Sequence, residues 1–462
     1  MQTTLTPLAK YKEFFENNRR QLIDEYFDFL KIPSISSEAA YTENVKQGAD
    51  WVAHYLRSIG FDVDVWKTTG HPTVFAQNLE AGTDKPTLLI YNHYDVQPVD
   101  PLDLWKSSPF EPALRGNEVY ARGAQDNKGQ CFYTMAALKA LRMIHGKFPI
   151  NIKLVVEGEE ECGSQGLTGI LSEKKKELVA EYLAVVDMGL PAKDIPAVTL
   201  GIRGIMTMDV TVTGSSTDLH SGSHGGIVYN PNRALAEILA SLYNDDGSVA
   251  VPGYYDSVRE LKKDTLDNLY MDFDEKHYLE AFGALPTGGE KKFLPVHRAC
   301  LRPTVEINGM WGGYTGDGFK TVIPAKAHAK ISCRLVADMD PQNSAKSVAD
   351  YLISKAPPGI KVEVHIHQGG GKAVQANPNS PVVKAFSDAY TEIFEKKCSY
   401  VFEGGSIPVI TALAEASKSA VVLLGMGLAD DGIHAPNEHF GLDRLEKGFL
   451  IIARSIELLG QR

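Results

Sequence analysis

Three adjacent carboxylates constrain the fold of this chain more than any other stretch of its sequence. Glu159, Glu160 and Glu161 follow the apolar run 152–156 and precede a glycine–serine turn at 163–164. Like charges held this close repel, so the folded chain must place positive charge beside them or keep one carboxyl protonated. A bound divalent metal ion would meet that need, whereas a solvated acidic turn is the commoner fate of a glutamate run. The stretch alone does not decide between the two.

Length and composition indicate a soluble enzyme with more than one domain. The chain has 462 residues, which is more than one ordinary core accommodates, so two domains are expected. The net charge of −11 argues against nucleic acid or an anionic membrane as a partner. The five cysteines form no CxxC pair, which is typical of free thiols in a reducing compartment. No secretory signal or membrane-spanning apolar stretch is found, so we expect a cytoplasmic protein.

Helix and strand patterns alternate in the first part of the chain and again near its end. Helices are predicted over 8–30, 44–59, 126–143, 166–179, 382–394 and 442–459. Strands are predicted over 61–66, 73–76, 87–91, 150–156, 182–186 and 420–424. Strands that alternate with helices in this way predict a layered α/β domain.

The pattern changes between these two parts. Strands that alternate as half-exposed strands do are predicted over 207–213 and 327–336, with a further strand over 361–367 and helices over 232–243 and 341–355. This content predicts a small α+β domain with an open antiparallel sheet. We therefore expect a catalytic domain of residues 1–199 and 379–462, with residues 200–378 inserted into it.

His93 lies just after the apolar strand 87–91, and strand ends are where open α/β sheets bind ligands. Asp95, two residues later, can accept a hydrogen bond from the ring nitrogen that does not face a metal. On spacing alone, a metal site and a surface His-x-Asp pair explain these two residues equally well.

Asp126, Asp187 and His434 are also placed beside predicted elements. Asp126 precedes a helix in a glycine-bounded turn, where capping the helix is the commoner role. Asp187 ends a buried strand, where an unpaired carboxylate is costly. His434 lies in a Gly/Pro-bounded loop, where a lone histidine is usually structural or solvated. Each residue taken alone is a weak signal.

Together with Glu161, these residues form a donor set that suits zinc or manganese. The set comprises two histidines and three carboxylates, namely His93, Asp126, Glu161, Asp187 and His434. One carboxylate of such a set can bridge two ions. Glu160 is not needed as a ligand and is then free to act as a general base on water that the metals activate.

The order of these motifs resembles the M20 family of di-metal peptidases, which includes aminoacylases and carboxypeptidases. The segments 218–222, 320–324 and 403–408, together with Arg334, are similar to the cytosolic dipeptidase, or carnosinase-like, branch of that family. The resemblance covers nearly the whole chain. It implies a three-layer α/β/α metallopeptidase catalytic domain with an inserted, ferredoxin-like α+β domain that serves as a lid and dimerisation module.

The resemblance also implies two divalent ions, most simply Zn²⁺ with Mn²⁺ as the other choice. Asp126 would bridge them, with His93 and Asp187 completing one site and Glu161 and His434 completing the other. Glu160 would be the general base, and Asp95 would orient the first histidine. The bond between Asp126 and Asn127 corresponds to a non-prolyl cis peptide in the family.

The inserted domain is expected to contribute residues to substrate binding. By resemblance, His220 would reach into the active site of the partner subunit of a homodimer and stabilise the developing oxyanion. Arg334 would bind a substrate carboxylate in a bidentate pair, and Thr321 and Ser406 would hydrogen-bond the same end of the substrate. Without the resemblance, a structural histidine and a solvated strand arginine would explain His220 and Arg334.

Two features bear on the side-chain preference of the site. Glu403, in the same Glu-Gly-Gly-Ser segment as Gly405, is assigned to substrate binding because it can receive a free α-amino group. Carnosinase-like enzymes carry a histidine directly before a Gly-Gly-Lys sequence in the lid, but here Gly369 occupies that position and His367 lies two residues earlier. Either His367 reaches the site from a shifted loop or that contact is missing.

We therefore predict a dimeric enzyme that hydrolyses dipeptides or short peptides with a free C-terminal carboxylate. An N-acyl amino acid deacylase of the same family is the alternative, because the chemistry is identical and only the acyl-side pocket differs. A non-catalytic metal-dependent dimer is a third possibility, which the intact set of ligands and base disfavours.

Overall fold

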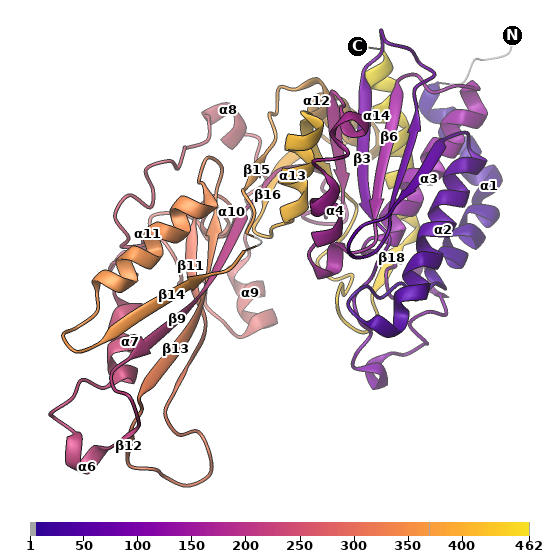
Figure 1. Cartoon of the computed structure of the whole chain (residues 1–462). Coiled ribbons are helices and arrows are strands. Elements are labelled where there is room, and N and C mark those ends of the chain that lie inside the picture. Colours follow the sequence, from indigo (N-terminus) through magenta and orange to yellow (C-terminus); the bar gives the residue numbers. More distant parts are fainter. Residues whose placement is uncertain (1–5, 369, 462) are drawn as a thin grey trace, which may run out of the picture.

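The computed structural model of the chain describes residues 6–368 and 370–461. Within these residues, the larger part of the molecule is built on a nine-stranded mixed sheet (Figure 1). The strand order is β1-β2-β6-β3-β7-β17-β8-β15, with β16 paired to β8. The strands are β1 (Asp62–Trp66), β2 (Thr73–Asn78), β3 (Thr87–His93), β6 (Asn151–Glu157), β7 (Tyr182–Val186), β8 (Ala197–Ile202), β15 (Val374–Gln375), β16 (Ser399–Glu403) and β17 (Ala420–Leu424).

Both faces of this sheet are buried, as the near-continuous apolar runs of its strands require. In β3, Leu88 and Ile90 pack into one hydrophobic cluster, whereas Leu89 and Tyr91 pack into another. The first cluster lies under α1 (Pro7–Leu30), α2 (Thr42–Ser58), α3 (Lys128–His145), α12 (Pro381–Phe394) and α14 (Leu442–Gly460). The second lies under α4 (Gln165–Ile170), α5 (Lys175–Leu178) and α13 (Pro408–Ser417). The predicted three-layer α/β/α architecture is confirmed.

One helix prediction needs correction. The apolar spacing indicated a single helix over 166–179, but this segment is divided into α4 and α5. Leu167, Leu171 and Leu178 lie on separate turns of the chain but are buried in the same core cluster. Their spacing in the sequence therefore resembles the apolar face of one continuous helix. Short connections also contain η1 (Ala39–Tyr41), η2 (Leu102–Leu104), η3 (Glu160–Cys162) and a small sheet of β4 (Ala113–Arg115), β5 (Glu118–Tyr120) and β18 (His439–Gly441).

The smaller part of the molecule is a ferredoxin-like α+β domain, as predicted. Its antiparallel sheet has the order β14-β9-β13-β11, and the elements follow one another as strand, helix, strand, strand, helix, strand. These elements are β9 (Gly204–Thr213), α7 (Pro231–Ala240), β11 (Thr304–Gly312), β13 (Lys326–Leu335), α11 (Pro341–Ser354) and β14 (Lys361–Ile366). Alternate residues of β9, from Met206 to Val212, are buried with residues of α7 and α11 in a separate core.

The sequence did not indicate the edge strand β11 or the short helices that precede it. These helices are α8 (Lys263–Leu266), α9 (Glu275–Phe282) and α10 (Pro295–Cys300). The register of β11 shifts between Ile307 and Gly309, and most of its residues are exposed or half-buried. A bulged, exposed edge strand lacks the regular alternation on which strand prediction depends.

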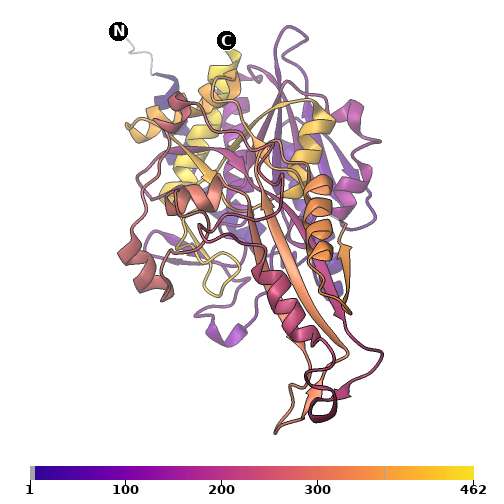
Figure 2. The same ribbon diagram turned by 90° about the vertical axis from the view of Figure 1, so that its left-hand side faces the viewer.

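A two-stranded ribbon lies at the end of the small domain that is farthest from the large sheet (Figures 1 and 2). It consists of β10 (Leu219–His220) paired with β12 (Val322–Ile323), together with α6 (Ser221–His224), and is called the distal ribbon below. The chain enters the small domain after β8 and returns to the large sheet at β15. The boundaries at 199/200 and 378/379 stay predictions, and β8 itself extends across the first of them.

Candidate metal centre and substrate cleft

The large sheet gathers predicted metal ligands at one edge. Strands β3, β6 and β7 run parallel, so their carboxyl ends meet at the same edge of the sheet. His93 is the last residue of β3, and Asp187 directly follows β7. Glu160 and Glu161 begin η3, three residues after β6 ends.

Asp126 lies between two histidines. Its Oδ1 atom is 3.1 Å from Nε2 of His93, and its Oδ2 atom is 3.0 Å from Nε2 of His434. His93 Nε2 is also 3.6 Å from Oδ1 of Asp187, and His434 Nε2 is 3.4 Å from Oε2 of Glu161. The five predicted ligands therefore form two groups of donor atoms, each within 4.8 Å of one another, that share Asp126. We call these two groups the metal centre.

Asp95 contacts both the imidazole of His93 and the loop after β6. Its Oδ1 atom is 3.3 Å from Nδ1 of His93. The backbone N–H groups of Glu160 and Glu161 donate to the two oxygens of Asp95 at 3.2 and 3.1 Å. One buried carboxylate thus fixes the imidazole on one side and the two glutamates on the other, which is the arrangement that an orienting aspartate requires.

The peptide bond between Asp126 and Asn127 is cis, as the resemblance implied. The Asn127 side chain connects two strand ends, because its amide donates to Oδ1 of Asp187 at 2.6 Å while its oxygen accepts the N–H of His93 at 3.4 Å. It also accepts a hydrogen bond from Asn92 at 2.9 Å. The residue that directly follows Asp126 therefore helps to position two other predicted ligands, His93 and Asp187.

Glu438, a residue to which the sequence gave no role, fixes the loop that carries Asp126. Its buried carboxylate accepts hydrogen bonds from the backbone N–H groups of Gly123, Gln125 and Asp126 at 2.9–3.0 Å. Arg122 Nη1 donates to the same carboxylate at 2.8 Å. His434 lies only four residues before Glu438. The ion pair between Arg122 and Glu438 therefore positions both the loop that carries Asp126 and the loop that carries His434.

Two carboxylates of the acidic run are hydrogen-bonded within the fold, and two lie at the metal centre. Glu157 accepts hydrogen bonds from the Tyr91 hydroxyl and from Ser164 Oγ, the latter at 3.0 Å. Glu159 accepts the backbone N–H of His71 at 2.8 Å. These two carboxylates are used within the fold, which leaves Glu160 and Glu161 beside the metal centre.

Burial makes the charges of the metal centre costly. It raises the pKa of Glu160 to about 8, and together with the neighbouring Asp126 it raises the pKa of Glu161 well above its usual range. Burial also raises the pKa of Asp187. For Asp126, burial acts in the same direction, but hydrogen bonds from His434 and His93 hold its pKa well below the usual range. Nearby divalent cations would favour the ionised form of each carboxylate.

The donor chemistry fits two transition-metal ions. Each group offers one imidazole nitrogen with carboxylate oxygens, a combination that suits zinc or manganese. Oε1 of Glu161 is buried and has no hydrogen-bond partner among the described residues, so a cation would satisfy it. Gln97 donates to the other oxygen of Glu161 at 2.7 Å and so orients that carboxylate.

A cleft of about 470 Å³ opens beside the metal centre. One wall contains Asp126, Glu160, Asp187 and His434, and further walls contain Ile202, Glu403, Gly405, Ser406 and Ile407. Burial raises the pKa of Glu403 at the end of β16. No salt bridge to Glu403 is found in the described part of the chain, so its charge has no cationic partner there.

Arg334 and Ser406 meet across the junction of the two domains. Arg334, near the end of β13, donates through Nη1 to Ser406 Oγ at 2.8 Å. Ser406 Oγ in turn donates to the backbone oxygen of Arg203, whose N–H donates to the oxygen of Gly405 at 3.0 Å. The pair that was assigned to a substrate carboxylate is therefore formed at the edge of the cleft.

His220 and Thr321 lie apart from this cleft, in and beside the distal ribbon. The backbone N–H of Ser221 donates to the oxygen of Thr321 at 3.0 Å, and both predicted residues are exposed. Strand β13 has ten residues and carries the ribbon about 30 Å away from the end that bears Arg334. Within one chain, Thr321 therefore lies far from Arg334 and Ser406, and its assignment to substrate binding stays a prediction.

His367 does not line the cleft. Its Nε2 atom is 3.2 Å from Oδ2 of Asp209 on the neighbouring strand β9. Gly369, the residue that departs from the family pattern, lies outside the described residues. The position of His367 therefore agrees with the second alternative, in which the substrate contact made by the lid histidine of carnosinase-like enzymes is missing.

The chain is similar to known peptidases over most of its length. Among the described residues, no helix has both the length and the apolar character needed to cross a membrane. The model of the family described as peptidase family M20/M25/M40 matches residues 89–458. The Cys-Gly metallodipeptidase of Schizosaccharomyces pombe is 30% identical, with 98% of each chain covered.

Two further proteins extend the comparison. The human beta-Ala-His dipeptidase is 31% identical over 79% of this chain and 73% of its own. The solved structure of an M20 family metallo-carboxypeptidase from Sulfolobus solfataricus has a TM-score of 0.82 and 30% identity, covering 96% of this chain and 99% of that one. The resemblance drawn from the motifs is confirmed. The chain belongs to peptidase family M20/M25/M40 and is a metallopeptidase.

Proposed function

We propose that this metallopeptidase hydrolyses dipeptides and short peptides that carry a free C-terminal carboxylate. The observation that carries the proposal is the position of Asp126 between His93 and His434, beside a cleft that also contains Glu403 and Ser406. The relatives named Cys-Gly and beta-Ala-His dipeptidases, which match most of the chain, support the same substrate class. The cytoplasmic location expected from the composition stays a prediction.

Two divalent ions, zinc or manganese, would be held by the two donor groups. His93, Asp126 and Asp187 would hold one, and Asp126, Glu161 and His434 the other. When bound, such ions lower the pKa of water and polarise a carbonyl group.

Glu160 is the group that moves the proton. It lines the cleft beside the ligands and is not needed as a ligand itself. As general base it takes a proton from the water that attacks the scissile carbonyl, and it then gives that proton to the leaving amine. Asp95 accepts the backbone N–H of Glu160 and so holds the segment of main chain that carries this carboxylate.

The two ends of a dipeptide match opposite charges in the cleft. Arg334 and Ser406 would bind the C-terminal carboxylate, because a guanidinium and a hydroxyl both donate hydrogen bonds to carboxylate oxygens. Glu403, buried without a cationic partner in the described residues, would receive the free α-amino group. Fixing both ends aligns the peptide bond with the metal centre.

A second copy of the chain would complete the site. The distal ribbon is too far from its own cleft, so His220 would act in the cleft of the partner subunit, and Thr321 would accompany it. Strand β11 forms one edge of the small sheet, and Met310 and Trp311 on it are about half exposed. An unpaired edge with exposed apolar side chains is a surface suited to a second copy.

The test compares free dipeptides with blocked ones. We expect the zinc- or manganese-loaded protein to hydrolyse Cys-Gly and β-Ala-His, and to lose most activity on their N-acetylated and C-amidated forms. Preference for the N-acetylated substrates would make the protein an N-acyl amino acid deacylase. Absence of hydrolysis across a broad dipeptide panel, with both ions bound, would make it a non-catalytic metal-dependent dimer.

A further inference from the structure

A second cavity, of about 510 Å³, lies where the two domains join. Its walls come from the ends of β8, β15 and β16 of the large sheet and from the segments 259–266 and 291–302 of the small domain. It is separate from the metal centre, although Ile202 lines both the cavity and the cleft. Neither the family motifs nor the proposed mechanism uses this space.

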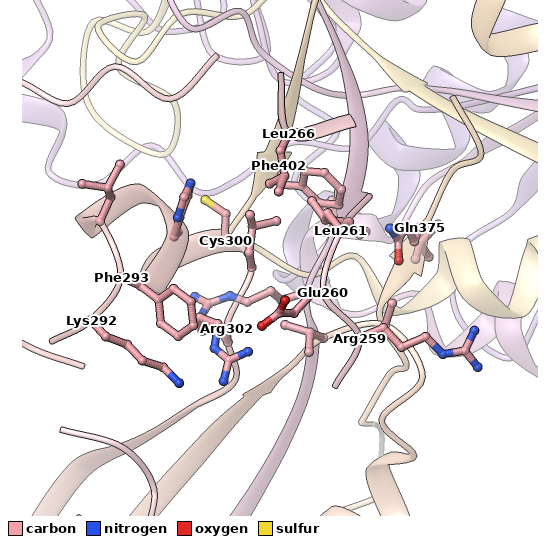
Figure 3. Close-up of a pocket in the computed structure, with 18 of the residues that line it drawn as sticks. Arg259, Glu260, Leu261, Leu266, Lys292, Phe293, Cys300, Arg302, Gln375 and Phe402 are labelled. Carbon is pink, nitrogen blue, oxygen red and sulfur yellow. The ribbon is translucent and has the colours of Figure 1, made fainter. Parts of the chain in front are cut away.

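The cavity is amphiphilic. Figure 3 shows Leu261, Leu266 and Phe402 gathered at one end with the thiol of Cys300. Glu260 and the cationic side chains of Arg302 and Lys292 lie toward the other end. A ligand that fills it must therefore have an apolar body and a charged group.

The charge of that group follows from the side chains that line the cavity. Five are cationic, namely Arg203, Arg259, Lys291, Lys292 and Arg302, and Glu260 is the one carboxylate in the lining. Arg302 is neutralised by Glu290 at 2.7 Å and Arg259 by Asp338 at 3.0 Å.

The three remaining cations, Arg203, Lys291 and Lys292, form no salt bridge with a carboxylate among the described residues. Lys291 donates instead to the backbone oxygen of Asp245 at 2.7 Å. The carboxylates of Glu306 and Asp246 act on Arg203 and Lys292 only by longer-range attraction. Burial lowers the pKa of Arg203 to about 10, as expected for a guanidinium with no anionic partner in direct contact. An anion in the cavity would supply that partner.

We propose that this cavity binds a small monocarboxylate with an apolar body, such as a medium-chain or aromatic carboxylic acid. The apolar part fills the end formed by Leu261, Leu266 and Phe402, where burial of apolar surface provides most of the affinity. The carboxylate pairs with Lys292 and with Arg203.

Arg203 connects the cavity to the substrate-binding loop. Its Nε donates to the oxygen of Gly404 and its backbone N–H to the oxygen of Gly405, both at 3.0 Å, and its own oxygen accepts the hydroxyl of Ser406. A ligand that draws the guanidinium into the cavity weakens the contact with Gly404. Because Ser406 also accepts from Arg334, we infer that the ligand raises KM for peptide substrates. This coupling rests on the proposed function, whereas the binding does not.

Calorimetry with octanoate as the probe tests the site on the full-length, metal-loaded protein. We expect saturable binding of octanoate, and much weaker binding of uncharged octanol. Leu261→Trp, which fills the apolar end, should reduce octanoate affinity more than tenfold. Lys292→Gln should reduce it about threefold, as removal of one exposed charge pair predicts. The matched controls Leu279→Trp and Lys276→Gln, at exposed positions of α9 outside the cavity, should leave it unchanged.

The metal centre is the other location at which a carboxylate could bind. The four variants distinguish binding in the cavity from binding at the metal centre. Octanoate bound at the metals would bind all four variants like the wild type, and that result would overturn the proposal, as would absence of saturable binding. Labelling of Cys300 by iodoacetamide, read by mass spectrometry, gives an independent measure. Octanoate should slow the labelling of Cys300 and leave that of the exposed Cys162 unchanged.

Kinetics then test the coupling. Saturating octanoate should raise KM for Cys-Gly about fivefold in the wild type and leave it unchanged in Leu261→Trp. Octanoate that binds but leaves KM and kcat of the wild type unchanged would overturn the coupling and retain the site. Failure of the unliganded wild type to hydrolyse any dipeptide would instead refute the proposed function, which the binding experiment does not depend on.

Discussion

The metal centre and the distal ribbon are built in opposite ways. At the metal centre, His93 is fully buried and contacts Asp95, Asp126 and Asp187. In the distal ribbon, His220 is exposed, and its ring accepts one local hydrogen bond from the N–H of Gly222 at 3.0 Å. The first histidine is positioned by its own domain, whereas nothing among the described residues positions the second for catalysis.

This difference separates two parts of the proposed reaction. The residues proposed to activate water include several carboxylates, which must be held close together despite their like charges. The edge of the large sheet can hold them within one chain, because buried hydrogen-bond partners surround them there. In the proposed reaction, the histidine that stabilises the oxyanion would come from another chain. We therefore expect changes at the metal centre to act within a subunit, and changes in the distal ribbon to act between subunits.

Glu160→Gln should produce the largest effect. Removal of this proposed general base should lower kcat by about 10²- to 10⁴-fold, because an amide cannot accept the proton of the attacking water. Steady-state kinetics on Cys-Gly, with metal content measured by atomic emission, would check this. The exposed Glu173→Gln serves as the control and should behave like the wild type. Near wild-type activity with two ions bound would show that another group is the base.

His220→Ala should lower kcat by about 10²- to 10³-fold, because one hydrogen-bond donor to the oxyanion is lost. The decisive measurement mixes this variant with Glu160→Gln. In a mixed dimer, the subunit that retains Glu160 receives His220 from its partner, so one site of the two is complete.

Random mixing of the two inactive variants should therefore recover about a quarter of the wild-type activity. A mixture that gains no activity, although mixed dimers are detected by native mass spectrometry, would contradict action across the interface. Recovery would show that the distal ribbon belongs functionally to the other subunit.

Local sequence patterns suggested the set of candidate ligands because most of its members follow a strand that the sequence marks clearly, whereas their division between two sites was implied by the resemblance. The apolar run of β3 points to His93, and the strand before Asp187 is equally distinct. In a parallel sheet, strand ends converge whatever the length of the connections, so a set of strand-end residues could be assembled without coordinates. The alternation of strands and helices predicted the layered α/β domain and the inserted α+β domain, whereas the three layers and the ferredoxin-like form were implied by the resemblance.

The residues that were missed depend on contacts between distant segments. Glu438 resembles an exposed loop residue in the sequence, and only the fold brings it to Arg122, which lies 316 positions away. Thr321 was grouped with Ser406 because both resembled substrate-binding positions, but the length of β13 separates them. β11 was missed because its irregular, exposed pattern carries little local signal.

Glu438→Gln should weaken metal binding by about 10- to 100-fold, as loss of a residue that orients metal ligands does. The amide would place an N–H group against the backbone N–H groups of Gln125 and Asp126, which now donate to a carboxylate oxygen. Competition with a chromophoric chelator measures the affinity. Glu392→Gln, which removes an exposed ion pair with Arg454, is the control. Unchanged metal affinity with a lower Tm would restrict Glu438 to a structural role.

Arg334→Lys should have the smallest effect. It also tests whether Arg334 serves the cleft of its own chain while His220 serves the cleft of the partner. A lysine cannot make the bidentate contact, so we expect KM for Cys-Gly to rise about fivefold, the equivalent of about 1 kcal/mol, which is the scale of one ordinary hydrogen bond. Arg334 contacts Ser406 of its own chain, whereas His220 lies at the opposite end of the same small domain. In the mixed dimer, Arg334→Lys should therefore raise KM when the chain with His220→Ala carries it, because that chain holds the working cleft. The same change on the chain with Glu160→Gln should leave KM unchanged. The reverse result would mean that the whole small domain, and not only its distal ribbon, serves the partner.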